Sequence, residues 1–172
     1  KSVEKAENGK VELTIAIAPD VPPGNHLMRI RTKTGISHAR QFFVGIFPNV
    51  DEKEPNSDFE TPQVIQLNQT VEGVVQNEDV DYYRVSLKKG QRLSVEVDGL
   101  RLGYTVFDPF LAIIDKDRFE KVISDDTILH RQDGYCSYVA EEDGDYTVMI
   151  RESSYRGGGN SFYRLHVGSY RR

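Results

Sequence analysis

The sequence predicts an all-β protein: an antiparallel, jelly-roll-like β-sandwich preceded by a shorter β segment. Residues that favour strands are abundant, with nine Tyr and eight Phe among 172 residues, and they are interspersed with Gly, Asp and Asn. Short stretches alternate between apolar and polar residues, and none longer than a turn or two keeps a 3.6-residue period. Short strands at regular spacing, separated by turn residues, indicate a sandwich or jelly roll.

The clearest pattern lies at residues 79–97, around which we expect the fold to be organised. Alternate apolar positions mark two strands: Tyr83, Val85 and Leu87, then Leu93, Val95 and Val97. Gly90 stands between them and can adopt a positive φ. We therefore expect a hairpin with a tight turn, whose apolar face is covered by the rest of the chain.

The other expected strands follow from the same alternation or from short apolar runs. Residues 110–114 form a continuous apolar run, which is typical of a strand covered on both faces. Residues 1–10 are polar, and we expect them to be disordered. In chain order, the remaining strands are expected at 11–17, 27–32, 41–45, 64–67, 70–75, 121–124, 135–141, 146–150 and 162–168.

Residues 48–58, which we call the acidic segment, interrupt this pattern. The segment contains two prolines and several acidic residues, and it has no apolar period. On composition it is a solvated linker, which divides the chain into a β segment at 1–47 and a sandwich at 59–172.

Composition excludes several classes of protein. A net charge of −5 argues against sequence-independent binding to nucleic acid, which needs a dense cationic surface. No apolar run approaches the roughly 20 residues of a membrane span. The single cysteine, Cys136, cannot form a disulfide within the chain. Because the chain begins at Lys1 without an initiator Met, we interpret it as an excised or processed segment.

Few residues have the spacing of a catalytic site. Cys136 with His130 could suggest a thiol nucleophile, but Cys136 shares a strand face with Tyr138, so we expect it in the core. The histidines are scattered without metal-ligand spacing. Clustered tyrosines on one sheet face could form a binding platform, and scattered surface tyrosines are the alternative. The tyrosines expected at the surface are Tyr82, Tyr104, Tyr135, Tyr155 and Tyr170.

Residues 52–168 resemble the bacterial pre-peptidase C-terminal domain, a module that follows the catalytic domains of secreted bacterial proteases. The resemblance depends on the order and spacing of short motifs rather than on any one of them. These motifs are Glu54-Pro55-Asn56, Val71-Glu72-Gly73-Val74, Asp79-Val80-Asp81-Tyr82-Tyr83, Asp108-Pro109-Phe110, Asp125-Asp126, Asp143-Gly144-Asp145-Tyr146 and Tyr163-Arg164-Leu165. Residues 11–47 resemble the last strands of an immunoglobulin-like domain of the IPT/TIG type, which often precedes such modules.

The resemblance also implies a Ca²⁺ site, because the related collagen-binding domains of clostridial collagenases hold calcium. The matching positions in this sequence are Glu52, Glu54, Asn56, Asp79 and Asp81. Calcium takes six to eight hard oxygen ligands, and alternate carboxylates on an extended chain point the same way. Ser57 departs from the family's Asn-Asp pattern, and the alternative is a solvated acidic linker beside an acidic turn.

Together these observations predict a non-enzymatic accessory module of a secreted or cell-surface bacterial protein. Its partners would be adjacent domains of a larger chain and a protein or polysaccharide surface. We expect Tyr82, Tyr104, Tyr135 and Tyr155 to contribute to that surface. A purely structural spacer or processing domain without a ligand is the alternative, and a hydrolase is a remote one.

Overall fold

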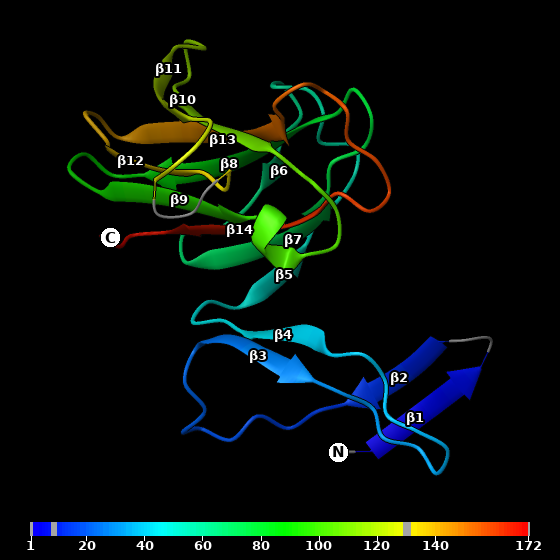
Figure 1. Cartoon of the computed structure of the whole chain (residues 1–172). Helices are drawn as coiled ribbons and strands as arrows, with labels where there is room; N and C mark the ends of the chain where they lie inside the picture. The colour runs from blue at the N-terminus through cyan, green and yellow to red at the C-terminus, as the bar shows by residue number, and fades with distance from the viewer. Residues whose placement is uncertain (1, 8–9, 129–131, 172) are drawn as a thin grey trace. The chain divides into compact units, whose positions relative to one another are not determined.

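The computed structural model describes residues 2–7, 10–128 and 132–171, which form two compact units, Lys1–Ile46 and Phe47–Arg172 (Figure 1). The all-β prediction is confirmed: within the described residues the one helical element is the short 3₁₀ turn η1, Leu100–Leu102. No helix among them is long and apolar enough to cross a membrane.

The first unit consists of two antiparallel strand pairs. Strand β1 (Ser2–Glu7) pairs with β2 (Lys10–Thr14), and β3 (Gly24–Met28) pairs with β4 (Arg40–Val44). The expectation of disorder at residues 1–10 is wrong for Ser2–Glu7, because the backbone of β1 pairs with β2 along its length. No residue between 12 and 46 is fully buried.

The second unit is a sandwich of two five-stranded sheets. The β8 sheet has the order β11-β10-β13-β8-β6, and the β9 sheet has the order β12-β9-β14-β7-β5. The strands are β5 (Asn49–Asp51), β6 (Gln63–Val64), β7 (Gln69–Val74), β8 (Val80–Leu87), β9 (Arg92–Asp98), β10 (Pro109–Ile114), β11 (Glu120–Ser124), β12 (Tyr135–Val139), β13 (Gly144–Glu152) and β14 (Phe162–Gly168).

The predicted hairpin at residues 79–97 is wrong in its pairing, although both strands exist. Strand β8 pairs with β13 and β6, whereas β9 pairs with β12 and β14, so the turn carries the chain from one sheet to the other. Gly90 has a φ of 80°, as its place in the turn requires. The apolar faces of β8 and β9 therefore pack against each other across the sandwich. In a hairpin the two strands would lie side by side in one sheet, and their apolar faces would not cover each other.

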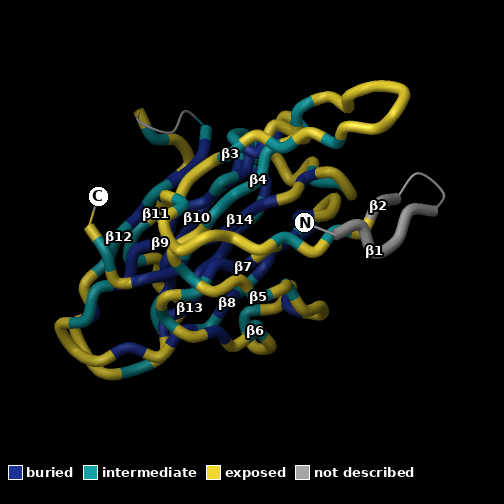
Figure 2. Tube along the Cα trace, turned by 90° about the horizontal axis from the view of Figure 1, so that it is seen from below, coloured by how far each residue is buried: buried dark blue, intermediate teal, exposed yellow. Residues whose placement is uncertain are grey.

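The core lies between the sheets. Figure 2 shows buried positions along much of the sandwich strands. Residues on alternate positions of β8 and β9 are fully or almost fully buried, as the alternation predicts. The largest fully buried side chains are Tyr83, Tyr163, Phe107, Leu93 and Leu111. Two of these are tyrosines, so the core must also provide hydrogen-bond partners for two buried hydroxyl groups.

The acidic segment differs from the predicted linker. It supplies β5, which pairs in parallel with β7, and the Glu52 amide extends this pairing by donating to the Glu72 carbonyl at 3.0 Å. Further along, the Asn56 carbonyl accepts a hydrogen bond from the Tyr82 amide at 3.0 Å. The segment is therefore part of the sandwich, and the second unit begins at Phe47 rather than at residue 59.

Candidate functional site

A group of carboxylates converges where the acidic segment meets the start of β8. One carboxylate oxygen from each of Glu54, Asp79 and Asp81 lies within 4.8 Å of the other two. Asp79 and Asp81 are two residues apart on an extended chain, so they share a face with Tyr83 and are buried. Glu54 is exposed and comes from the acidic segment. The cluster thus has one open side.

Asp79 is held in place by three hydrogen bonds from neighbouring residues. Its Oδ1 accepts from the Ser57 hydroxyl at 2.9 Å and from the Val80 amide at 3.0 Å. Its Oδ2 accepts from the Gln76 amide at 3.1 Å. The Ser57 position that departs from the family pattern therefore has a structural role, because its hydroxyl ties the acidic segment to Asp79.

Glu52 and two core tyrosines extend the cluster into the sandwich. Glu52 Oε1 accepts from the Tyr83 hydroxyl at 2.9 Å and from the Tyr163 hydroxyl at 2.7 Å, and the two hydroxyls also contact each other. Glu52 Oε2 accepts from the Val74 amide at 3.0 Å. Tyr163 additionally contacts Asp81 Oδ2 at 2.9 Å. Glu52 therefore lies on the core side of the converging carboxylates, and both of its oxygens accept hydrogen bonds from protein groups.

Asp81 is the most perturbed acid of the cluster. Burial, with the negative charges of Glu52 and Asp79, raises the pKa of Asp81 to about 9. The side chain is 0% exposed. A carboxyl group in such a place either carries its charge beside a cation or keeps its proton and stays neutral. At neutral pH in the absence of a cation, Asp81 holds a proton.

Gly73 makes room for the tyrosine that reaches this cluster. Gly73 on β7 is the register partner of Tyr163 on β14. A Cβ at Gly73 would overlap the Tyr163 ring carbon Cζ and hydroxyl, and it would stand 2.9 Å from Glu52 Oε1. The Tyr163 ring therefore crosses β7 where a side chain is missing.

The Asn56 amide can face the carboxylates in two ways. With its nitrogen toward them, it donates to Glu54 Oε2 at 2.7 Å and to Asp81 Oδ1 at 3.2 Å, and its oxygen accepts from Tyr83. In the reverse orientation its nitrogen lies 3.3 Å from the Tyr83 hydroxyl and its oxygen faces the two carboxylates. Oxygens so arranged repel one another unless a cation lies between them.

The residues present therefore fit a calcium ion. The donors that converge are all hard oxygens, from Glu54, Asp79, Asp81 and, in one orientation, Asn56. Of the five residues in the predicted calcium set, these four come together, and Glu52 lies one step behind them. No His or Cys belongs to the group, which makes a zinc site a poor fit.

The tyrosines predicted to form a binding surface lie in three places. On the β8 sheet, Tyr82 packs edge-on against Phe59 with ring centroids 6.0 Å apart, and the nearby Tyr155 packs on Arg151. Tyr135 contacts Tyr170 on the β9 sheet, and Tyr104 contacts Phe162. The structure does not bring the four predicted tyrosines onto one face, so a platform made of all four is not formed.

A polar chain that the sequence analysis missed lies on the β9 sheet. Thr70 Oγ1 is 2.9 Å from His166 Nδ1, and His166 Nε2 is 2.9 Å from Asp98 Oδ2. Burial opposes ionisation of Asp98, but His166 and Arg101 lower its pKa overall. The order of groups resembles a catalytic triad, yet Thr70 is 0% exposed, so a substrate cannot reach its hydroxyl. Because these residues are far apart in sequence, no spacing motif could have indicated them.

The predicted core position of Cys136 agrees with the structure. Its side chain is buried, and burial raises the pKa of the thiol to about 12, which suppresses the reactive thiolate. His130, its suggested partner, lies outside the described residues.

Comparison with known protein families gives a match to part of the second unit. A family model described as the bacterial pre-peptidase C-terminal domain matches residues 79–152. No curated protein sequence matches the chain significantly.

Three solved structures are similar at low sequence identity. The pre-peptidase C-terminal domain of a collagenase from Bacillus anthracis is 15% identical, with 62% of this chain and 93% of that chain covered and a TM-score of 0.49. PliG from Aeromonas hydrophila, a periplasmic inhibitor of g-type lysozyme, is 15% identical, with 62% and 95% covered and a TM-score of 0.46. PliG from Salmonella Typhimurium, also a periplasmic inhibitor of g-type lysozyme, is 16% identical, with 70% and 96% covered and a TM-score of 0.39.

The second unit is a two-sheet, all-β sandwich domain. More particularly, its residues 79–152 match the bacterial pre-peptidase C-terminal domain, and the predicted resemblance is thereby confirmed. Domains of this family are found in bacterial peptidases and occur in secreted bacterial proteins.

Proposed function

We propose that this chain is the accessory part of a secreted or cell-surface bacterial protein, and that its sandwich binds Ca²⁺ and attaches to a polymer or protein surface. The observation that carries the calcium site is the convergence of Glu54, Asp79 and Asp81 within 4.8 Å, with Asp81 fully buried. Three carboxylates so close repel one another, and a divalent cation is the ordinary remedy for that repulsion in proteins.

Calcium would supply positive charge where the acidic segment joins β8. Glu54 and Asn56 would hold it from the acidic segment, and Asp79 and Asp81 would hold it from the start of β8. Glu52 would orient Asp81 through Tyr163 rather than bind the metal. Because the ligands come from both sides of this junction, the bound ion would fasten the acidic segment to the sandwich.

The test is a melting experiment in excess EDTA and in millimolar Ca²⁺. A ligand at 100 times its dissociation constant stabilises the folded state by about 2.7 kcal/mol, so we expect a clear rise in the melting temperature. Asp81→Asn should reduce the rise. The matched control is Asp145→Asn, since Asp145 is an exposed carboxylate outside the cluster. Identical wild-type curves in EDTA and in Ca²⁺ would rule out the site.

The proposed attachment surface is the aromatic group of the β8 sheet. The Arg151 guanidinium lies over two rings, at 4.1 Å from the centroid of Phe110 and 4.5 Å from that of Tyr155. Tyr82 and Phe59 add a second pair of rings. Rings held by packing and by a guanidinium offer rigid contact area at low entropy cost, which suits binding to an extended surface.

Attachment can be measured by co-sedimentation with insoluble polysaccharides and structural proteins. Truncation of an aromatic anchor typically costs 2 kcal/mol or more, so Tyr155→Ala should weaken binding by about tenfold or more. Tyr104→Ala is the control, because Tyr104 packs against Phe162, away from the Arg151 group. If Tyr155→Ala leaves co-sedimentation unchanged, the aromatic group is not the attachment surface, and if no polymer is bound, the alternative of a structural spacer is favoured.

A further inference from the structure

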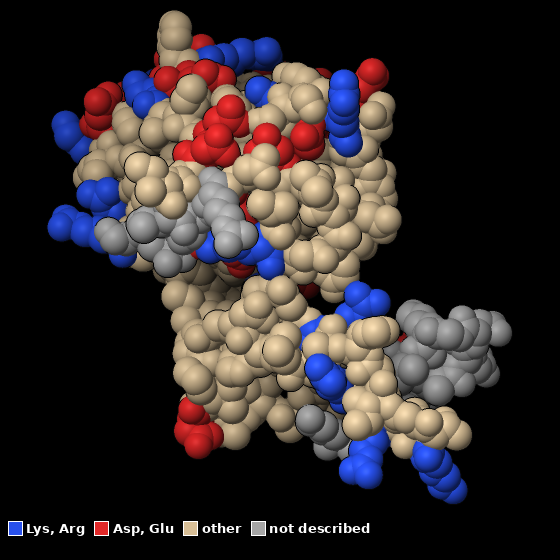
Figure 3. Space-filling view, viewed as in Figure 1, with Lys and Arg blue, Asp and Glu red and all other residues tan. Residues whose placement is uncertain are grey.

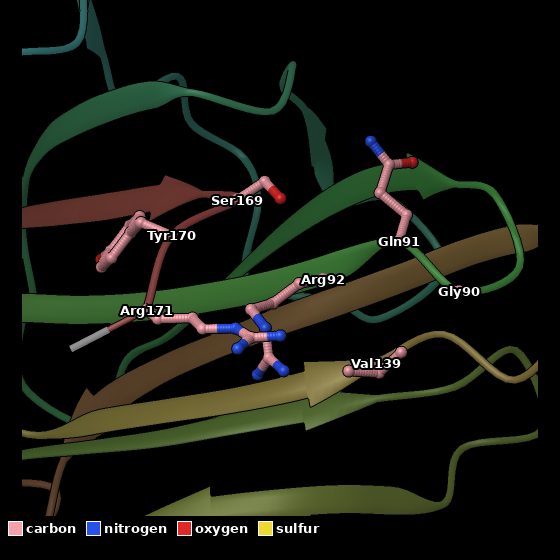
Figure 4. A pocket seen from close by; sticks show the side chains of 7 residues that line it. All are labelled: Gly90, Gln91, Arg92, Val139, Ser169, Tyr170 and Arg171. Atoms are coloured by element: carbon pink, nitrogen blue, oxygen red, sulfur yellow. The ribbon is translucent and has the colours of Figure 1, made fainter.

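Two arginines line a polar pocket in the second unit at the end of the β9 sheet (Figure 4). The pocket has a volume of about 440 Å³, within the range of roughly 300–1,000 Å³ that is usual for small-molecule sites. Arg92 opens β9, and Arg171 follows β14 near the end of the chain. Figure 4 shows the two side chains extending toward one another. Figure 3 likewise shows basic side chains gathered at the end of the sandwich where the chain terminates.

Hydrogen bonds hold the Arg92 guanidinium and the backbone next to Arg171. Arg92 Nη1 donates to Ser137 Oγ at 2.8 Å, and Ser137 Oγ is 3.0 Å from Ser94 Oγ. Ser94 Oγ in turn donates to the Tyr170 carbonyl at 2.6 Å, on the backbone that carries Arg171. This chain of hydroxyls connects one guanidinium to the backbone that positions the other. One arginine of the pocket is therefore held by the protein, and the other extends from backbone that is tied to the same hydroxyls.

Among the described residues, neither guanidinium has a carboxylate partner. Across the described ranges, no ion pair of Arg92 or Arg171 with a carboxylate is formed. Like charges that line one pocket repel each other, and an anion bound between them relieves that repulsion. Guanidinium groups recognise planar oxyanions through paired hydrogen bonds, so the group that fits between them is a carboxylate.

The rest of the pocket favours a sugar as the carrier of that carboxylate. Its other lining groups are mainly polar, including the Ser169 hydroxyl and the Gln91 amide, and Val139 is the one aliphatic side chain. Gln91 Oε1 already accepts from the Lys88 amide at 3.0 Å, which leaves its NH₂ group to donate. Tyr170 adds an aromatic ring to the lining. A peptide carboxyl terminus would need an apolar side-chain pocket, which these residues do not provide.

We infer that the Arg92–Arg171 pocket binds the carboxylate of a uronic acid unit in an acidic polysaccharide. This inference gives a ligand class to the attachment proposed above and rests on that function, although not on the calcium site or on the aromatic group of the β8 sheet. The Arg pair would hold the carboxylate, while Ser169 and Gln91 would hydrogen-bond to sugar hydroxyls. Tyr170 would pack against the face of the ring.

The experiment is calorimetric titration of the full chain with a trimer of galacturonic acid, performed both in Ca²⁺ and in EDTA. The methyl-esterified trimer and inorganic sulfate serve as matched probes. We expect the acidic trimer to bind in both media and the ester to bind at least about tenfold more weakly, because hydrogen bonds to a charged group contribute more than one factor of ten. Equal binding of acid and ester, or equal affinity for sulfate, would overturn the inference.

Variants locate the binding. Arg92→Gln and Arg171→Gln should each weaken binding of the trimer by about tenfold or more. Arg92→Lys should recover only part of this loss, because lysine keeps the charge but lacks the planar guanidinium that makes two parallel hydrogen bonds to a carboxylate. Arg29→Gln is the control, because it removes the same charge from an exposed position of the first unit, outside the pocket. Circular dichroism checks that each variant is folded. An equal loss in Arg29→Gln would assign binding to overall charge and refute the pocket.

Loss of trimer binding and loss of the broader function can be told apart. If the trimer does not bind but Ca²⁺ raises the melting temperature and the chain co-sediments with other polymers, only the uronate inference fails. If co-sedimentation fails with every polymer and the trimer does not bind either, the attachment function fails with it.

Discussion

Replacing Gly73 by alanine tests how Tyr163 reaches the carboxylates. The added methyl group would overlap the Tyr163 ring and hydroxyl, and the ring lies in the core with little space to move. Overpacking of this kind costs about 1–3 kcal/mol. If the ring moves, its hydroxyl also loses contact with Glu52 and Asp81, and a hydrogen bond to a charged group contributes about 1.5–3 kcal/mol. We expect a total loss of about 2.5–6 kcal/mol in the free energy of unfolding.

The assay is urea denaturation of four proteins: the wild type, Gly73→Ala, Tyr163→Leu and the double variant. Leucine lacks the ring carbon and hydroxyl that the new methyl group would meet. Most of the cost of Gly73→Ala should therefore disappear in the Tyr163→Leu background, as a large coupling energy in the double-mutant cycle. Gly158→Ala is the control, because no heavy atom lies within 4 Å of a Cβ at Gly158.

Two results would refute this reasoning. One is an equal cost of Gly73→Ala in both backgrounds, which would show that Tyr163 is not the residue displaced. The other is a cost no greater than that of Gly158→Ala, which would show that the ring adapts freely.

Three further predictions follow from buried polar groups. Without metal, folded Asp81 keeps a proton that the unfolded chain releases above its ordinary pKa of 3.8, because the pKa of Asp81 is raised to about 9 in the folded state. Between these values stability should therefore fall as pH rises, by up to about 1.4 kcal/mol per pH unit relative to Asp81→Asn, and parallel profiles of the two proteins in urea denaturation would contradict this. Asp133 accepts from the amides of Gly99, Leu100 and Arg101 and pairs with the Arg101 side chain at 2.6 Å, so Asp133→Ala should cost about 3–5 kcal/mol in the same assay, against little for Asp117→Ala, which is exposed. Cys136 is 4% exposed and the pKa of its thiol is about 12, so a thiol reagent should label it only after unfolding, and rapid labelling of the folded chain would be inconsistent with its place in the core.

The sequence predicts the strands of the sandwich well and their partners poorly. Alternation at Tyr83, Val85 and Leu87 identifies the buried face of β8, because the side-chain period of a strand is two. It does not say whether the next strand pairs beside β8 or packs across from it, since both choices bury the same face. The predicted hairpin failed for that reason.

The candidate site is only partly accessible to sequence reasoning. The two-residue spacing of Asp79 and Asp81 places them on one face, and the structure has them there. The burial of Asn56 and the use of Glu52 by core tyrosines could not be inferred, because Tyr163 is more than 100 residues away from the acidic segment. Acidic composition alone indicates a solvated linker, and only the fold identifies β7 and β8 as its neighbours.

Strands β5 and β6 have a consequence for anyone who isolates this domain. Each adds a parallel strand to the outer side of a sheet, β5 beside β7 and β6 beside β8. A fragment beginning at residue 59 would lack β5 and leave the backbone of β7 unpaired along that side. Unpaired strands recruit other chains, so such a fragment should self-associate where one beginning at Phe47 stays monodisperse. By supplying β5, the acidic segment thus also protects the domain from aggregation.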